Sequence, residues 1–216
     1  MNRREFSAGA ACVVAVAGLG LSPMAWAQKK PEDGNEYKTL DKRVATDAPA
    51  GKIEVVEFFW YACPHCNAFE PQLEAWQKKL PADVVLRRVP VAFRDSFVPQ
   101  QRLFYTLETM GKLDELHRKV FNAIHQEKLA LNKEDLILAW VEKQGVDKAK
   151  FQEVYNSFGT STKARRAAQL QDAFKVEGVP ALGIAGRWYT DGSMAGNMPR
   201  AVQVAEYLIA EARKAR

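Results

Sequence analysis

Two cysteines separated by two residues, Cys63 and Cys66, are the side chains of this sequence best suited to do chemistry. They lie between an apolar run at 53–60, which predicts a buried strand, and a helical pattern over 63–80. A cysteine that begins a helix faces free backbone N–H groups and the positive end of the helix dipole, and both favour the thiolate. Because the thiolate is the reactive form in disulfide exchange, the pair predicts redox chemistry, with Cys63 as nucleophile and Cys66 as resolving thiol.

Two other uses of a cysteine pair fit the sequence less well. A structural disulfide stabilises a fold by closing a long loop, whereas this pair would close over only two residues. A structural zinc site needs about four ligands, and beyond the pair the chain offers only His65, His117 and His125. We therefore expect no metal and no cofactor beyond a redox-active disulfide.

The residues between the cysteines indicate the direction of the reaction. Pro64 suits the first helical turn, where its missing N–H leaves no bond unmade. An imidazole at His65 would stabilise the Cys63 thiolate further. Each unit by which a thiol pKa falls below the ambient pH stabilises the reduced form by about 1.4 kcal/mol and raises the potential by about 30 mV. The motif therefore predicts an oxidant, although His65 could also be an exposed helix-start histidine with no electrostatic role.

A second candidate site is the dipeptide Val179-Pro180, which precedes a short strand predicted at 181–184. A proline that opens a strand is a reasonable place for a cis peptide bond. In thioredoxin-like folds a loop with such a proline faces the cysteine pair, and the backbone of the preceding residue pairs with an extended substrate. Val179 and Pro180 are thus the predicted substrate-binding residues.

Glu57 interrupts the apolar strand, where a carboxyl is costly unless it is paired or protonated. Near the sulfurs it could relay a proton when Cys66 is deprotonated for attack. The alternative is a strand residue that reaches the sheet edge or a lysine. Glu70 is a weaker candidate for the same electrostatic role. Trp60 and Tyr61, next to the motif, are expected to border an apolar groove.

The order of the predicted elements gives an α/β fold with a central mixed sheet flanked by helices and an inserted helical domain. A strand at 37–40 precedes a βαβ unit that ends with a strand at 84–93. Helical patterns fill 98–175, with three or four helices, a core that includes Leu136 and Ala139, and helix ends at Gly111 and Gly145. A hairpin at 181–189 and a helix at 199–215 follow. The predicted domain parts are 28–97, 98–175 and 176–216.

Residues 1–27 have the pattern of a cleaved export signal, with Arg3-Arg4, an apolar run and the small-x-small sequence Ala25-Trp26-Ala27. Twin-arginine and general secretion both fit, and a retained N-terminal anchor is the alternative. Cleavage would remove Cys12, so Cys63 and Cys66 would be the mature protein's two thiols. A net charge of +5 without a dense basic block makes nucleic acid a poor candidate partner. We expect a monomer.

The sequence resembles the DsbA family of bacterial periplasmic thiol:disulfide interchange proteins. The resemblance rests on Glu57-Phe58-Phe59, Cys63-Pro64-His65-Cys66, Phe69-Glu70 and Gly178-Val179-Pro180, and it covers essentially the whole chain after the predicted signal. It implies a thioredoxin-like fold and a Cys63–Cys66 disulfide that is donated to reduced exported proteins through a mixed disulfide at Cys63. It also implies reoxidation by a DsbB-like membrane quinone reductase. The alternatives are a disulfide isomerase or reductase, and a periplasmic peptide-binding module without turnover.

Overall fold

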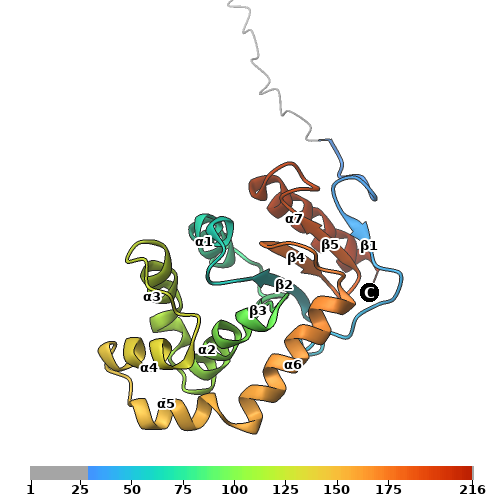
Figure 1. Ribbon diagram of the computed structural model, residues 1–216. Helices are drawn as coiled ribbons and strands as arrows, with labels where there is room; N and C mark the ends of the chain where they lie inside the picture. Colours follow the sequence, from blue (N-terminus) through green and yellow to red (C-terminus); the bar gives the residue numbers. More distant parts are fainter. Residues whose placement is uncertain (1–28, 216) are drawn as a thin grey trace, which may run out of the picture. The chain divides into compact units, whose positions relative to one another are not determined.

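In the computed structural model, which describes residues 29–215, five strands form one mixed sheet (Figure 1). The spatial order is β1-β5-β4-β2-β3, in which β2 and β3 are parallel and the other neighbours are antiparallel. The strands are β1 (Lys38–Thr39), β2 (Ile53–Phe59), β3 (Val84–Pro90), β4 (Ala181–Ile184) and β5 (Trp188–Asp191). The mixed sheet predicted from the sequence is confirmed. β3 ends at Pro90, earlier than expected, because Pro90 pairs with Phe59 at the end of β2.

β2 is the central strand, and all of its residues are buried. α1 (Pro64–Gln77) follows it directly and covers one face of the sheet together with α7 (Met198–Lys214), as Figure 1 shows. The core on this face includes Phe69 and Leu73 of α1 and Leu208 of α7. Because the end of β2 leads straight into α1, the packing that fixes this strand also fixes the start of the helix.

The segment between β3 and β4 is helical, as predicted, but it contains five α-helices instead of three or four. A short 3-10 helix, η1 (Asp95–Phe97), leads into α2 (Val98–Thr109), α3 (Leu113–His125), α4 (Glu134–Lys143), α5 (Lys148–Tyr155) and α6 (Phe158–Ala173). The break between the last two occurs because the Ser157 side chain accepts a hydrogen bond from the Thr160 N–H and starts a new helix. We call these five helices, α2 to α6, the helical block.

One part of the expected core of the helical block is wrong. Leu136 and Ala139 are exposed on α4, and the neighbouring Ile137, Leu138 and Val141 are buried instead. The helix therefore presents a different face to the core than the sequence pattern indicated. The predicted helix ends are confirmed, because Gly111 and Gly145 adopt left-handed backbone angles with φ of +66° and +77°.

The described part of the chain contains no helix that is both long enough and apolar enough to span a bilayer. The predicted signal, with Arg3-Arg4 and Cys12, lies outside the described residues. From Pro31 onward the chain forms one compact unit.

Candidate active site

Cys63 lies at the N-terminus of α1, as the sequence predicted. It is the N-cap residue, with φ −79° and ψ 119°, and its Sγ accepts a hydrogen bond from the backbone N–H of Cys66 at 3.4 Å. Its own N–H donates to the carbonyl of Trp60 at 3.0 Å, and Pro64 occupies the first helical turn. The sulfur thus takes the place that a Ser or Asp oxygen fills in an ordinary N-cap, where negative charge is favoured.

The two thiols of the motif have opposite acidities. A hydrogen bond from the Cys66 thiol, followed by the backbone N–H groups of the helix start, lowers the pKa of Cys63 from 9.0 to about 6. Cys66 is completely buried, and that burial raises the pKa of its thiol well above the ordinary value. At neutral pH the arrangement therefore holds a thiolate at Cys63 and a protonated thiol at Cys66.

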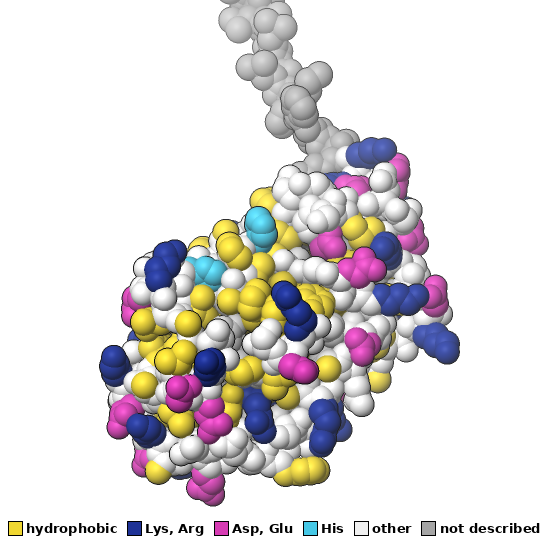
Figure 2. Space-filling view, in the orientation of Figure 1, with side chains coloured by type: hydrophobic (Ala, Val, Ile, Leu, Met, Phe, Trp, Pro, Cys, Tyr) yellow, Lys and Arg dark blue, Asp and Glu magenta, His cyan; other side chains and the backbone are white. Residues whose placement is uncertain are grey.

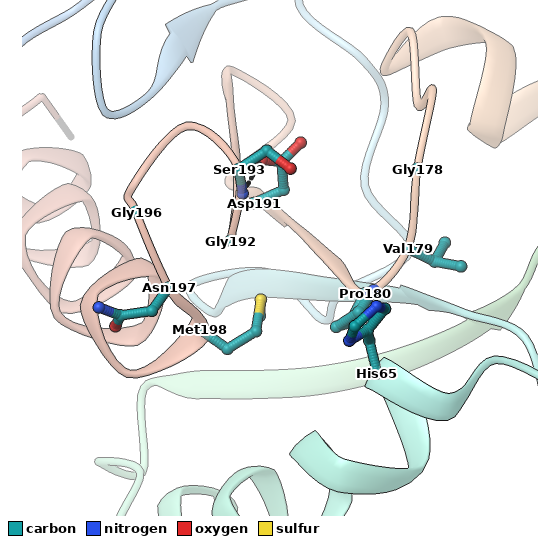
Figure 3. A pocket seen from close by; sticks show the side chains of 10 residues that line it. All are labelled: His65, Gly178, Val179, Pro180, Asp191, Gly192, Ser193, Gly196, Asn197 and Met198. Atoms are coloured by element: carbon teal, nitrogen blue, oxygen red, sulfur yellow. Dashed lines mark hydrogen bonds between the residues drawn. The ribbon is translucent and has the colours of Figure 1, made fainter.

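His65 lies at the surface beside Pro180, and both line a pocket of about 390 Å³ (Figure 3). Its ring does act on Cys63 by charge, in the direction that the sequence predicted, but this is the weakest of the influences that lower the Cys63 pKa. The backbone N–H of His65 lowers that pKa more than its imidazole does. The helix start and Cys66 thus account for most of the acidity.

The Val179-Pro180 peptide bond is cis, as predicted. Its loop lies against the motif, because the Cys63 thiol donates a hydrogen bond of 3.4 Å to the carbonyl oxygen of Val179. The opposite side of the pocket is the connection between β5 and α7, with Asp191, Ser193 and Met198, which sequence reasoning did not identify (Figure 3). The Asp191 carboxylate accepts hydrogen bonds from the N–H groups of Ser193 and Met194, which fixes that connection.

Behind Cys66, Glu57 and Glu70 are both fully buried and share one arginine, Arg88 of β3. Arg88 donates a hydrogen bond of 2.6 Å from one terminal nitrogen to Glu70 Oε1, and its Nε lies 3.3 Å from Glu57 Oε2. Among residues 29–215, neither oxygen of Glu57 has a hydrogen-bond partner. Glu57 therefore lies beside a cation, but this is an arginine and not the lysine of the alternative interpretation, and Glu70 belongs to the same buried cluster.

The two carboxyls respond differently to this environment. Burial raises the pKa of Glu57 well above its ordinary value, and the charge of Glu70 raises it further. Glu70 is buried too, but its polar contacts with His117 and Arg88 and the charge of Arg88 outweigh that burial and lower its pKa. Glu57 also acts by charge on Cys66 and raises the pKa of that thiol. A carboxyl whose charged form is disfavoured by burial thus accompanies the thiol that must gain or lose a proton.

The sequence suggested that Tyr61 borders an apolar groove, and this expectation is wrong. Tyr61 is buried, and its hydroxyl lies 2.8 Å from Nδ1 of His117 on α3. The same helix reaches the Tyr61 carbonyl oxygen with Nε2 of His125, also at 2.8 Å. Trp60 is half-buried and stacks on Phe97, with ring centroids 3.8 Å apart. Neither histidine was predicted to contact the motif, because only the tertiary fold brings α3 to Tyr61.

Within residues 29–215 the structure brings together no group of three or more His, Cys, Asp or Glu side chains that could hold a metal ion. The chemistry available to the described residues is that of two thiols, two buried carboxyls and the hydrogen-bonding groups around them.

Comparisons with known proteins agree on one family. Residues 54–203 match the family model of the DSBA-like thioredoxin domain. A thiol:disulfide interchange protein DsbA from Bordetella pertussis is 41% identical over 203 residues, which cover 94% of this chain and 96% of that protein. The crystal structure of Pseudomonas aeruginosa DsbA is 41% identical, with a TM-score of 0.80 over 84% of this chain and 94% of that one. The oxidoreductase DsbA from Xylella fastidiosa is 26% identical, with a TM-score of 0.79 over 86% of this chain and 99% of that one.

Proposed function

Because this chain belongs to the DsbA-like thioredoxin family of thiol:disulfide oxidoreductases, we propose that it is a periplasmic dithiol oxidase that donates its Cys63–Cys66 disulfide to newly exported proteins. In the first step a substrate thiolate attacks Cys63 Sγ. The Cys63–Cys66 bond breaks, a mixed disulfide forms between substrate and Cys63, and Cys66 leaves as a thiolate that takes up a proton. A second substrate thiolate then attacks the substrate sulfur, and Cys63 leaves as a thiolate. The substrate is oxidised and the enzyme is reduced by two electrons.

The observation that carries the proposal is the position of Cys63 as the N-cap of α1, with the Cys66 N–H 3.4 Å from its sulfur, because this position favours the thiolate. With a pKa of about 6, the reduced enzyme holds Cys63 as a thiolate at neutral pH, and this thiolate is a good leaving group in the second step. Each unit by which that pKa lies below the ambient pH stabilises the reduced form by about 1.4 kcal/mol and raises the potential by about 30 mV. The enzyme therefore tends to give up its disulfide.

Two features support an extended, unfolded substrate. The Val179 carbonyl oxygen, which lies 3.4 Å from Cys63 Sγ, belongs to the cis-proline loop. The backbone of an extended substrate that approaches the sulfur would form hydrogen bonds with this loop. Apolar side chains gather on the face of the molecule seen in Figure 2, with histidine side chains among them and charges scattered around. Val179 and Pro180 are thus the proposed substrate-binding residues.

The buried carboxyl gives the proposed reaction a proton source. Glu57, whose pKa is raised by its burial, donates a proton to the Cys66 thiolate as it leaves, and becomes a carboxylate itself. In the reverse direction, when Cys66 attacks to re-form the disulfide, the carboxylate takes the proton back.

The cellular setting follows from the family and from the N-terminal sequence. We propose export by residues 1–27, action as a monomer without metal or cofactor, and reoxidation by a DsbB-like membrane quinone reductase.

The test is the redox equilibrium of Cys63–Cys66 against glutathione, with the Cys63 pKa read in the same samples from the ultraviolet absorbance of the thiolate. We expect a potential well above that of the glutathione couple, together with oxidation of a reduced, unfolded substrate protein. A potential near that of a cytosolic reductant would contradict the oxidase and favour a reductase.

A further inference from the structure

The helical block contributes one ionisable side chain to the buried cluster behind Cys66, and this side chain is His117 of α3. His117 is packed among the rings of Phe59, Tyr61, Phe104 and Phe121, at centroid distances of 5.3 to 6.0 Å. Its Nδ1 lies 2.8 Å from the Tyr61 hydroxyl, and its Nε2 lies 3.4 Å from Glu70 Oε1. The ring therefore bridges the segment before Cys63 and one of the two buried carboxyls.

The charge state of Glu70 determines which tautomer the ring adopts. Burial lowers the pKa of His117, so the ring is neutral and carries one proton. If that proton were on Nδ1, the lone pair of Nε2 would face the Glu70 carboxylate and repel it. With the proton on Nε2, the ring presents N–H to Glu70 and accepts the Tyr61 hydroxyl at Nδ1. Burial also raises the pKa of Tyr61, which keeps its hydroxyl proton available for this bond.

Glu57 and Glu70 compete for the single guanidinium of Arg88. Glu70 has the shorter contact with it, 2.6 Å against 3.3 Å, and Nε2 of His117 lies 3.4 Å from the same Glu70 oxygen, a close polar contact that falls short of a full hydrogen bond. Two carboxyls that share one cation do not ionise equally, and the one with more donors keeps the charge. The proton then remains on the other carboxyl.

We propose that His117 is a positioning residue for the thiol chemistry, because its Nε2–H keeps Glu70 as the charged partner of Arg88 and thereby leaves the exchangeable proton on Glu57. This inference rests on the proposed function, since it concerns the proton that Cys66 gains and loses. His117 touches neither substrate nor sulfur, and it acts only through the two carboxyls.

Other charged groups near His117 do not perform the same role. His117 and Arg88 line a cleft of about 350 Å³ between α1 and α3. Around that cleft α1 contributes Glu74, Lys78 follows the end of α1, and α3 contributes Asp114 and Arg118. Glu74 acts on His117 only by charge, in the direction that favours its protonation, and less strongly than Glu70 does.

Carboxyl titration by NMR of the reduced protein with ¹³C-labelled glutamate tests the proposal, with the Glu57 signal assigned from a Glu57→Gln variant. His117→Phe keeps a ring in the aromatic cluster and removes both nitrogens. His117→Asn keeps an acceptor for Tyr61 but is too short to reach Glu70, so it serves if the Phe variant does not fold. In either variant we expect the Glu57 pKa to fall and the Glu70 pKa to rise, each by about one unit. The pH dependence of the step that releases Cys66 should shift with Glu57.

Two further variants separate this role from a structural one. His117→Gln restores an N–H near Glu70, and it should return the Glu57 pKa towards the wild-type value. His125→Phe is the matched control on the same helix, because it removes a bond to Tyr61 without touching a carboxyl. It should leave Glu57 unchanged. An unchanged Glu57 pKa in His117→Phe and His117→Asn, or equal shifts in His117→Phe and His125→Phe, would overturn the inference. Failure of the wild type to oxidise a reduced substrate would instead overturn the proposed function, because the titration is read without turnover.

Discussion

Cys63 and Cys66 are one helical turn apart, yet they lie in two regions with opposite physical character. The region around Cys63 is a helix start at the surface, open to the pocket beside the cis-proline loop, and it supplies donors to the sulfur. The region around Cys66 is sealed, and it contains two carboxyls that share one arginine. The first lowers a thiol pKa and the second raises one.

The comparison shows that the chemistry is divided by location and not by residue type. A thiol that must attack and leave needs stabilised negative charge, and the Cys66 thiol together with the backbone N–H groups of the helix start supplies most of it, with a smaller part from the charge of His65. A thiol that must be exchanged internally needs a nearby proton carrier, and a buried carboxyl supplies it because its own charged form is disfavoured. Each region could be disturbed separately, which makes the division testable.

Removing either sulfur should have the largest effect. Cys63→Ala and Cys66→Ala should both lose oxidase turnover completely, because neither can form the internal disulfide. With oxidised glutathione, however, Cys66→Ala should form a lasting mixed disulfide at Cys63, since no resolving thiol is present to release it. Cys63→Ala should form none, because Cys66 is buried and protonated. Mass spectrometry of the intact protein checks both, and an adduct on Cys63→Ala would contradict the division of roles.

Breaking the charge balance of the buried region should have the next largest effect. Arg88→Met would leave Glu57 and Glu70 without their shared cation, and we expect a loss of about 3–5 kcal/mol in the free energy of unfolding. Arg87→Met is the comparison on the same strand, because Arg87 pairs with the exposed Asp47 at 2.7 Å and has only a longer contact, 3.8 Å, with the buried Glu54. It should cost less than Arg88→Met, because its main partner is solvated. Urea denaturation of the reduced proteins measures both, and equal losses would show that the buried cluster is not special.

The pH dependence of stability should distinguish Cys63 from Cys66. The pKa of Cys63 falls from 9.0 to about 6 in the folded reduced protein. A pKa lowered by folding stabilises the fold above the unfolded pKa, and that contribution is lost as the pH falls through the folded pKa. The reduced protein should therefore gain stability relative to Cys63→Ser as the pH rises from about 6 to 9. In the oxidised protein neither sulfur titrates, so the stability of the oxidised wild type relative to Cys63→Ser should not rise over this pH range. Denaturant midpoints across this range provide the measurement.

The smallest effect is expected from His65, the residue to which the sequence analysis assigned the direction of the reaction. His65→Ala should raise the Cys63 pKa by less than about one unit and lower the potential by less than about 30 mV, because the imidazole contributes least to the acidity. Thiolate absorbance against pH and the glutathione equilibrium measure both quantities. A larger rise would mean that the imidazole, and not the helix start, controls Cys63.

Features fixed by neighbours in the chain were predictable. The strand before Cys63, the helix after it and the hairpin at Ala185-Gly186 follow from local patterns, and the left-handed backbone at Gly111 needed only a glycine at a helix end. The cis bond at Val179-Pro180 was predictable only in the company of the cysteine motif. The extra helix of the helical block depends on one serine cap, which has the same appearance in sequence as many solvated serines.

Features that join distant segments were not predictable. Arg88 contacts Glu70 of α1 from β3, and His117 contacts it from α3, 47 positions further along the chain. An arginine within a short apolar strand and a histidine among aromatic residues are signals of a buried partner, but they do not say which partner. The sequence analysis also placed Tyr61 at a groove. This was wrong because α3 covers Tyr61, and that contact between distant segments is visible only in the fold.

The two bonds from α3 to Tyr61 have a consequence for domain grafting and for recombination between relatives. The helical block resembles a module inserted into a sheet, so a breakpoint just before α2 and another just after α6 would seem natural for a chimaera. Such an exchange would separate Tyr61 from His117 and His125. It would also separate Glu70 from His117. A functional graft must therefore bring a helical block whose α3 side chains fit the Tyr61 hydroxyl and carbonyl.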